Sequence, residues 1–348
     1  MKSGKKSLAV LAMAAIMILS MVGCGNKVSD SEASTNSGEN SSTVNIADGN
    51  VSDNKIKIVT TIFPEYDWVR EILGDEINRA DLIMLLDNGV DLHSYQPTAE
   101  DIMKISDCDL FVYVGGESDS WVDNALKEAV NKDMKVINLL EVLGDSVKEE
   151  EVVEGMQAEE EEEESEEEEP EYDEHVWLSL RNAQVLCSAI ADALEEIAPD
   201  HADSSQKNVE AYNNRLSTLD EAYQSVVDKA TRKTLLFGDR FPFRYLVDDY
   251  GLSYYAAFVG CSAETEASFE TITFLAQKVD ELHLSYVMTI EKSDQKIANT
   301  IIENTKEKNQ QILTLDSMQS TTSEDVAKGT TYVSVMEENL NILMEALQ

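Results

Sequence analysis

The chain has 348 residues, with 68 acidic and 27 basic side chains, so its formal net charge at pH 7 is −41. A surface this acidic repels nucleic-acid phosphates and anionic lipid head groups, which sets both aside as partners. Hydrophobic residues make up 43% of the chain, a normal share for a globular protein, whereas the 15 glycines and 5 prolines are too few for a collagen-like or turn-dominated all-β architecture. The length predicts about two domains.

The N-terminal residues have the pattern of an export signal followed by a tether. Three lysines precede an apolar run from Leu8 to Val22, which is too short and too one-sided for a comfortable membrane span. We therefore predict a signal peptide over residues 1–23. The next residue, Cys24, follows a glycine in a pattern that resembles the lipobox of bacterial lipoproteins, in which the cysteine is acylated. Residues 24–54 would then be the acylated cysteine and a flexible tether rich in Ser, Asn, Asp and Gly; the alternative is an ordinary signal peptide with an incidental cysteine.

From Lys55 onward, short β-rich runs alternate with helical stretches. The expected strands are 56–61, 79–86, 110–114 and 135–139, and later 234–237, 254–258, 286–290 and 311–315. The expected helices are 66–73, 98–106 and 121–131, and later 242–250, 269–282, 292–309 and 332–347. This alternation is typical of βαβ units, in which helices cover both faces of a parallel sheet.

One long helix is expected between the two sets, over residues 203–230. Its apolar residues recur at intervals of three and four: Val209, Tyr212, Leu216, Leu219, Tyr223 and Val226. Such a helix would be about 40 Å long, which is more than one lobe needs. A coiled-coil dimer is the alternative interpretation, but we predict a monomer with two α/β lobes, 55–202 and 233–348, joined by a rigid helix over 203–232.

Residues 149–174 fit neither lobe, because 17 of these 26 residues are Asp or Glu. A run of like charges repels itself, so we predict a mobile loop. It would serve either as a solubilising insertion or as a weak collector of cations.

The cysteines and histidines are few. Once Cys24 is acylated, the remaining cysteines (Cys108, Cys187 and Cys261) cannot all pair within one chain, and we expect them to be small buried residues. The four histidines are His93, His175, His201 and His283, of which the last two sit at expected helix ends and are given no role. His93 follows a strand and precedes a helix, the loop position where open α/β sheets hold their ligands, and His175 lies where the acidic segment returns to ordered structure.

Two segments that contain these histidines carry a family resemblance. GVDLHSYQPTAEDI (89–102) and DEHVWLSLRNA (173–183) resemble the first two metal-ligand motifs of the zinc- and manganese-binding lipoproteins of ABC importers, the ZnuA/TroA-like solute-binding proteins. VTTIFPEYDWVREILGD (59–75) resembles the first strand and helix of that family, and ILTLDSM (312–318) resembles its last ligand segment, with Asp316 at the carboxylate position. The resemblance implies a metal buried between the lobes, with two ligands from each.

The third ligand position departs from the family pattern. In LLFGDRFPFRY (235–245), Arg240 stands where the family carries His or Glu, and an arginine cannot bind a cation. We expect the neighbouring Asp239 to be the ligand instead, although it is equally well placed to cap a helix, and Glu264, Glu266 or solvent are alternatives. Arg240 would either turn outward and leave Asp239 facing the metal, or face inward and pair with a carboxylate, which we expect to be Asp316. In the second case the guanidinium would take the space and charge that the cation needs.

The resemblance implies a lipid-anchored receptor on the extracytoplasmic face of a bacterial cell membrane. It would capture a divalent metal and deliver it to the permease of an ABC transporter, and it would not be an enzyme. His93, His175, Asp239 and Asp316 would hold Zn²⁺; imidazoles and carboxylates also suit Mn²⁺, but zinc-type members often carry a charged loop before the second histidine. A surface adhesin and a metal-dependent hydrolase are the alternatives, the latter without any hydrolase motif in the sequence.

Overall fold

The computed structural model describes residues 55–157, 171–262 and 266–348. The predictions for the signal peptide, Cys24, the tether, the centre of the acidic segment and Glu264 therefore lie outside the described residues. No helix in the three described ranges is long and apolar enough to cross a membrane.

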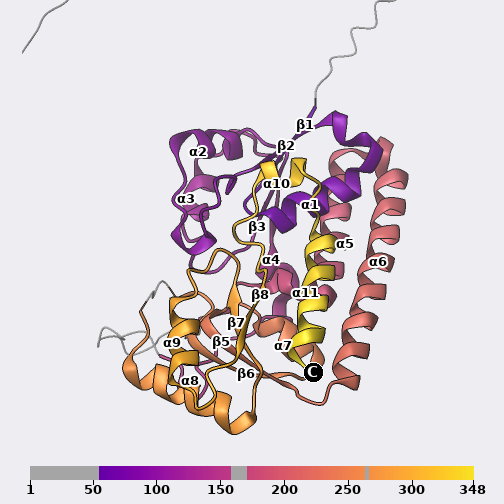
Figure 1. Ribbon diagram of the computed structural model, residues 1–348. Helices are drawn as coiled ribbons and strands as arrows, with labels where there is room; N and C mark the ends of the chain where they lie inside the picture. Colours follow the sequence, from indigo (N-terminus) through magenta and orange to yellow (C-terminus); the bar gives the residue numbers. More distant parts are fainter. Residues whose placement is uncertain (1–54, 158–170, 263–265) are drawn as a thin grey trace, which may run out of the picture. The chain divides into compact units, whose positions relative to one another are not determined.

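The N-terminal lobe is built on a parallel four-stranded sheet (Figure 1). Its strands are β1 (Ile56–Thr60), β2 (Ala80–Met84), β3 (Leu110–Tyr113) and β4 (Lys135–Asn138), in the order β2-β1-β3-β4. The helices that connect and cover them are α1 (Phe63–Leu73), α2 (Ala99–Ser106), α3 (Val122–Lys127) and α4 (Leu139–Leu143). All four residues of β3 are buried, as expected for a strand covered on both faces.

The C-terminal lobe repeats this plan with a second parallel sheet, in the order β6-β5-β7-β8. Its strands are β5 (Thr234–Phe241), β6 (Ser253–Val259), β7 (Tyr286–Ile290) and β8 (Gln311–Leu315). Its helices are α7 (Arg244–Tyr250), α8 (Phe269–Leu282), α9 (Lys296–Asn304), α10 (Ser323–Ala327) and α11 (Tyr332–Ala346). The predicted fold class, two parallel βα lobes with one long helix between them, is confirmed.

The long helix is α6 (Ala202–Lys229), within a residue of its predicted bounds, and it does not stand alone. The 18-residue α5 (Leu180–Ile197), which the sequence analysis missed, packs along it. The sequence does contain the signals of α5. Ser179 is its N-cap and accepts a hydrogen bond from the Asn182 N–H. The buried residues of the helix recur along one face: Leu180, Ala183, Leu186, Cys187, Ile190, Ala191 and Leu194.

The last helix, α11, packs against α1 and α6 and also against β8 of the C-terminal lobe (Figure 1). The Tyr332 N–H, at its first residue, donates to Asp67 Oδ2 of α1 at 2.7 Å, and the Tyr223 hydroxyl of α6 donates to the Met336 carbonyl at 2.6 Å. The contiguous hydrophobic core accordingly includes residues of both lobes, such as Phe111 and Phe237.

The flanks of the acidic segment are ordered, contrary to the mobile loop predicted over its whole length. The Glu150 N–H donates to the Glu171 carbonyl at 2.9 Å, which ties the two flanks together. Further along, the Gln157 N–H donates to the Ala257 carbonyl at 2.9 Å, at the edge strand β6. The sequence prediction weighed only the charge, but Val153 packs on the core and Met156 is buried, so apolar side chains anchor this part.

Candidate metal centre

Each of the two motif histidines lies in or next to a short 3₁₀ turn held by an aspartate. Asp91 Oδ1 accepts a hydrogen bond from the His93 N–H at 3.1 Å, at the start of the turn Leu92–Ser94. Asp173 Oδ1 accepts from the His175 N–H at 2.8 Å, just before the turn Val176–Leu178. The second turn is fixed in place by the wholly buried Trp177, whose Nε1–H donates to the Ser317 carbonyl of the C-terminal lobe at 2.9 Å.

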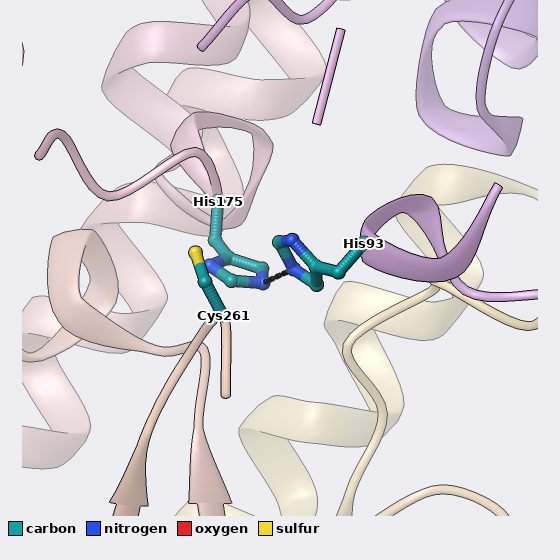
Figure 2. Close-up of side chains that lie close together, drawn as sticks. All are labelled: His93, His175 and Cys261. Atoms are coloured by element: carbon teal, nitrogen blue, oxygen red, sulfur yellow. Dashed lines mark hydrogen bonds between the residues drawn. The ribbon is translucent and has the colours of Figure 1, made fainter. Parts of the chain in front are cut away.

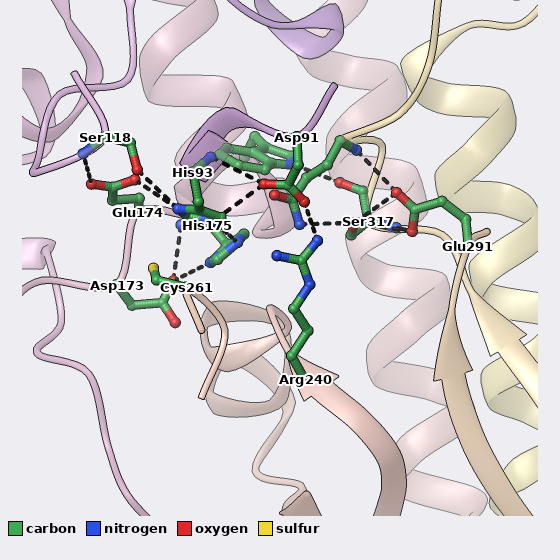
Figure 3. Close-up of polar contacts among 12 residues, drawn as sticks. Asp91, His93, Ser118, Asp173, Glu174, His175, Arg240, Cys261, Glu291 and Ser317 are labelled. Atoms are coloured by element: carbon green, nitrogen blue, oxygen red, sulfur yellow. Dashed lines mark hydrogen bonds and ion pairs between the residues drawn. The ribbon is translucent and has the colours of Figure 1, made fainter. Parts of the chain in front are cut away.

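The two imidazoles face each other through their Nε2 atoms, which lie 3.1 Å apart (Figure 2). The outer nitrogens have polar partners: His93 Nδ1 lies 2.9 Å from Ser118 Oγ and 3.4 Å from Glu174 Oε2, and His175 Nδ1 lies 3.1 Å from Asp173 Oδ1 (Figure 3). A carboxylate on the outer nitrogen orients a metal-binding histidine and leaves its inner nitrogen for the ion. The arrangement therefore suits a metal between the two Nε2 atoms.

Charge around the pair favours a cation. Burial alone would raise the pKa of Glu174, but its contacts with His93 and Ser118 outweigh burial and hold that pKa below its usual range. Glu174 therefore stays ionised beside His93 at neutral pH. A pocket of about 220 Å³ opens here, and four of its lining residues are glutamates. The full lining is His93, Glu117, Ser118, Glu150, Glu171, Tyr172, Glu174 and Cys261.

Cys261 joins the two histidines, which the sequence analysis did not foresee. Its Sγ and one ring nitrogen of each histidine lie within 4.8 Å of one another, and Figure 2 shows the sulfur beside the His175 ring. The residue is partly buried, its N–H donates to Glu150 Oε1 at 3.1 Å, and burial raises the pKa of its thiol. The expectation of a small buried residue holds for Cys108 and Cys187 but not for Cys261. The missed signal was its position just after β6, because parallel sheets hold ligands at the carboxyl ends of their strands.

Asp239 is not part of this cluster. It lies within β5, where its Oδ2 accepts a hydrogen bond from Ser293 Oγ at 2.5 Å and its Oδ1 accepts from the Arg240 N–H at 3.0 Å. The alternative role as a helix cap is wrong, because β5 continues to Phe241 and α7 begins only at Arg244.

Arg240 faces inward, which is the second of the two expected cases, but its partner differs from the expected one. Its guanidinium pairs with the Asp91 carboxylate of the N-terminal lobe rather than with Asp316 (Figure 3). Burial alone would raise the pKa of Asp91, but the charges of Arg240 and His93 hold it below its usual range. At the position where the family resemblance implies His or Glu, this chain thus carries the positively charged Arg240, whose charge is neutralised by Asp91.

Asp316 lies just after β8 and is likewise outside the cluster in the structure. Its Oδ1 accepts a hydrogen bond from the Met318 N–H at 2.7 Å, and burial together with the charge of Glu291 raises its pKa to about 6. Glu266, another residue considered for the third ligand, is exposed. Among the described His, Cys, Asp and Glu residues, the group close enough to share one ion is His93, His175 and Cys261.

Two parallel βα lobes with a carboxylate-held histidine pair between them define a two-lobed class of binding protein. Within it, the family model described as the zinc-uptake complex component A, periplasmic (ZnuA) matches residues 58–346, and the chain belongs to this family.

Several relatives and solved structures are similar to the chain. It is 33% identical over 298 residues to the zinc-binding lipoprotein AdcA of Streptococcus pneumoniae, which covers 84% of this chain and 56% of AdcA. It is 31% identical over 310 residues to the high-affinity zinc uptake system protein ZnuA of Bacillus subtilis, which covers 88% of this chain and 92% of the relative. The chain thus spans about half the length of the AdcA relatives it matches.

A crystal structure of the Zn(II)-bound ZnuA-like domain of Streptococcus pneumoniae AdcA superposes with a TM-score of 0.65 at 31% identity, covering 84% of this chain and 99% of that domain. The metal-dependent lipoprotein YcdH of Bacillus subtilis gives a TM-score of 0.68 at 26% identity, covering 84% of this chain and all (100%) of that one.

Proposed function

We propose that this protein captures a zinc ion between its lobes and delivers it to the permease of an ABC importer. The observation that carries the proposal is the histidine pair, with each outer nitrogen beside a carboxylate and the two Nε2 atoms 3.1 Å apart. A tetrahedral zinc ion with bonds of about 2.0–2.1 Å to nitrogen separates two imidazole nitrogens by about 3.3 Å, so the pair needs almost no movement to bind one.

The names of the relatives support zinc as the cargo and an uptake system as the partner. In this proposal the protein is a carrier and not an enzyme, it works outside the cytoplasm, and Cys24 carries the lipid anchor. His93 and His175 are the ligands of the N-terminal lobe. Asp316 is proposed as a ligand of the C-terminal lobe because its segment resembles the last ligand segment of the family, and Mn²⁺ remains the competing cargo.

Calorimetric titration of the metal-free full chain with Zn²⁺ tests the proposal. We expect one tight site per chain, and we expect His93→Ala and His175→Ala each to weaken it by at least about 100-fold, because loss of even an outer partner of a ligand costs 10–100-fold. Circular dichroism should be unchanged, because both histidines lie outside the α-helices and strands. Asp316→Ala in the same titration tests the proposed carboxylate ligand.

His201→Ala is the matched control, since His201 lies outside the centre and pairs with Glu76. It should bind zinc as the wild type does. A wild-type chain that retains no divalent metal, or histidine variants that bind as tightly as the wild type, would refute the proposal. A parallel titration with Mn²⁺ should show clearly weaker binding, and the reverse order would make manganese the cargo.

A further inference from the structure

The C-terminal lobe is one ligand short if the family pattern is followed literally. The family resemblance implies two ligands from each lobe, but Arg240 occupies the third position and its guanidinium is bound to Asp91. Asp239, the nearest substitute along the chain, is bound to Ser293 instead. A donor from another element of this lobe is needed to complete the site.

Cys261 lies just after β6 of the C-terminal lobe, and its position makes it the candidate for this missing donor. Its sulfur lies within 4.8 Å of a ring nitrogen of both His93 and His175. A zinc ion with bonds of about 2.3 Å to sulfur and 2.05 Å to nitrogen separates the two donor atoms by about 3.6 Å. With respect to the ring nitrogens that lie within 4.8 Å, the sulfur would have to approach by at most about 1.2 Å, which is within the reach of a rotation about χ1 of one cysteine.

The backbone before Cys261 is shaped for this approach. Gly260 passes so close to the His175 ring that a Cβ there would lie 2.9 Å from Cε1, and equally 2.9 Å from the Phe241 carbonyl oxygen. A side chain at this position would push β6 away from the imidazole. The glycine thus lets the end of β6 bring Cys261 against the histidines, and Cys261 lines the same acidic pocket as His93.

We propose that Cys261 is the third protein ligand of the metal, bound as a thiolate, and that it makes the centre selective for zinc over manganese. The inference rests on the proposed zinc-receptor function. On binding, the S–H bond breaks, its proton leaves to solvent by way of the neighbouring Glu150 carboxylate, and the sulfur lone pair forms the bond to zinc. Thiolate is a soft ligand that suits Zn²⁺, whereas Mn²⁺ prefers oxygen ligands. With His93, His175 and Asp316, the set supplies two ligands from each lobe, and the thiolate and the carboxylate together cancel the two positive charges of the ion.

Cobalt(II) in place of zinc tests the sulfur directly, because a thiolate–cobalt bond gives a near-ultraviolet charge-transfer band that nitrogen and oxygen ligands do not give. The full chain loaded with one Co²⁺ should show this band, and Cys261→Ser should lose it. The zinc affinity of Cys261→Ser should fall by at least about tenfold. Its preference for Zn²⁺ over Mn²⁺ should narrow. Cys187→Ser, a buried cysteine of α5, and Cys24→Ser are the controls and should keep both the band and the affinity.

A second measurement needs no variant. Iodoacetamide labelling of the wild-type chain, mapped by peptide mass spectrometry, should modify Cys261 slowly in the metal-free protein, because burial raises the pKa of its thiol, and much more slowly when one zinc ion is bound. Equal labelling of Cys261 with and without zinc, or a charge-transfer band that persists in Cys261→Ser, would overturn the inference.

The two proposals fail in distinguishable ways. Suppose that the wild-type chain binds one Co²⁺ without showing the band and that His93→Ala no longer binds Co²⁺. This result would remove Cys261 from the site, while the receptor function would stand. A wild-type chain that binds neither Co²⁺ nor Zn²⁺ would remove both.

Discussion

Asp239 and Arg240 are neighbours on β5, yet their side chains make unrelated contacts. Asp239 is held by Ser293 within its own lobe, whereas Arg240 crosses to Asp91 of the other lobe. Asp91 Oδ1 in turn lies 3.9 Å from Nε2 of His93, so Arg240 neutralises a carboxylate next to the proposed zinc position. At the scale of single residues, the effect of each on metal binding follows from these contacts.

We expect Arg240→His to tighten zinc binding by about tenfold. The substitution removes a positive charge near the proposed zinc position, and the repulsion between two such charges in a partly buried site is of this order. The change frees the Asp91 carboxylate and places an imidazole at the position where the family carries one. Asp239→Ala should change zinc affinity by less than about threefold, because its carboxylate is committed to Ser293; it should cost only about 1 kcal/mol of stability for the lost hydrogen bond. Competition with a zinc-binding dye measures both affinities.

Arg244→His is the matched control, since Arg244 has a similar exposure to Arg240 but pairs with Glu151 and Asp248 away from the histidines. It should leave zinc affinity unchanged. If Asp239→Ala instead abolished tight binding, the ligand role expected from the sequence would be restored and the contact with Ser293 would have to open when zinc binds.

At the scale of elements, the junction between α1 and α11 rests on a buried charge. Asp67 is fully buried, lies 2.7 Å from the Arg70 guanidinium, and accepts the N–H of Tyr332 at the start of α11. Burial raises its pKa to about 6, although Arg70 and the Tyr332 N–H oppose the shift. The pKa of an unfolded Asp is about 3.9, so the folded state holds the proton more tightly. The free energy of unfolding therefore falls as the pH rises from about 4 to 6.

Asp67→Asn should remove this part of the pH dependence. A shift of about two pKa units corresponds to about 3 kcal/mol. Relative to the wild type, the unfolding free energy of the variant should rise by about 2 kcal/mol between pH 4 and pH 7, because the unfolded Asp is already about half ionised at pH 4. This rise is expected even if the variant is less stable at pH 4. Urea unfolding of the metal-free proteins at the two pH values measures the difference, with Asp123→Asn, an exposed carboxyl on α3, as the control. A pH-independent difference between Asp67→Asn and wild type would contradict the assigned shift.

At the scale of the described residues as a whole, the two lobes share the larger cluster of buried hydrophobic residues, and a second, smaller cluster around Leu275 lies within the C-terminal lobe. Phe111 of the N-terminal sheet and Phe237 of the C-terminal sheet belong to the same contiguous cluster of buried residues. Hydrogen bonds also cross between the lobes: the Tyr245 hydroxyl donates to the Asp173 carbonyl at 2.8 Å, next to His175. Separate unfolding of either lobe would expose this shared surface to water.

We therefore expect a single cooperative thermal transition, with calorimetric and van't Hoff enthalpies in agreement. Free zinc at about 100 times its dissociation constant should stabilise the protein by about 2.7 kcal/mol. His93→Ala should show the same single transition but no stabilisation at that zinc concentration. Two resolved transitions would show that the lobes unfold independently.

The sequence by itself determined the order of the strands in the described residues, the long helix α6 and the two histidine motifs, but it did not reveal α5. β7 and β8 begin and end at the predicted residues, and α6 differs by one, because alternation and helical periodicity are local properties of the chain. His93 and His175 were found through motifs in contiguous segments, although 82 positions separate them.

Only the tertiary structure decided what surrounds the histidines. The partner of Arg240 is 149 positions away along the chain, and the glutamate beside Cys261 is 111 positions away. Neither pairing has a local periodicity or a turn signal to reveal it. Such contacts depend on how the carboxyl ends of two separate sheets meet, and that meeting is fixed by the packing of α5, α6 and α11 rather than by any single segment of sequence.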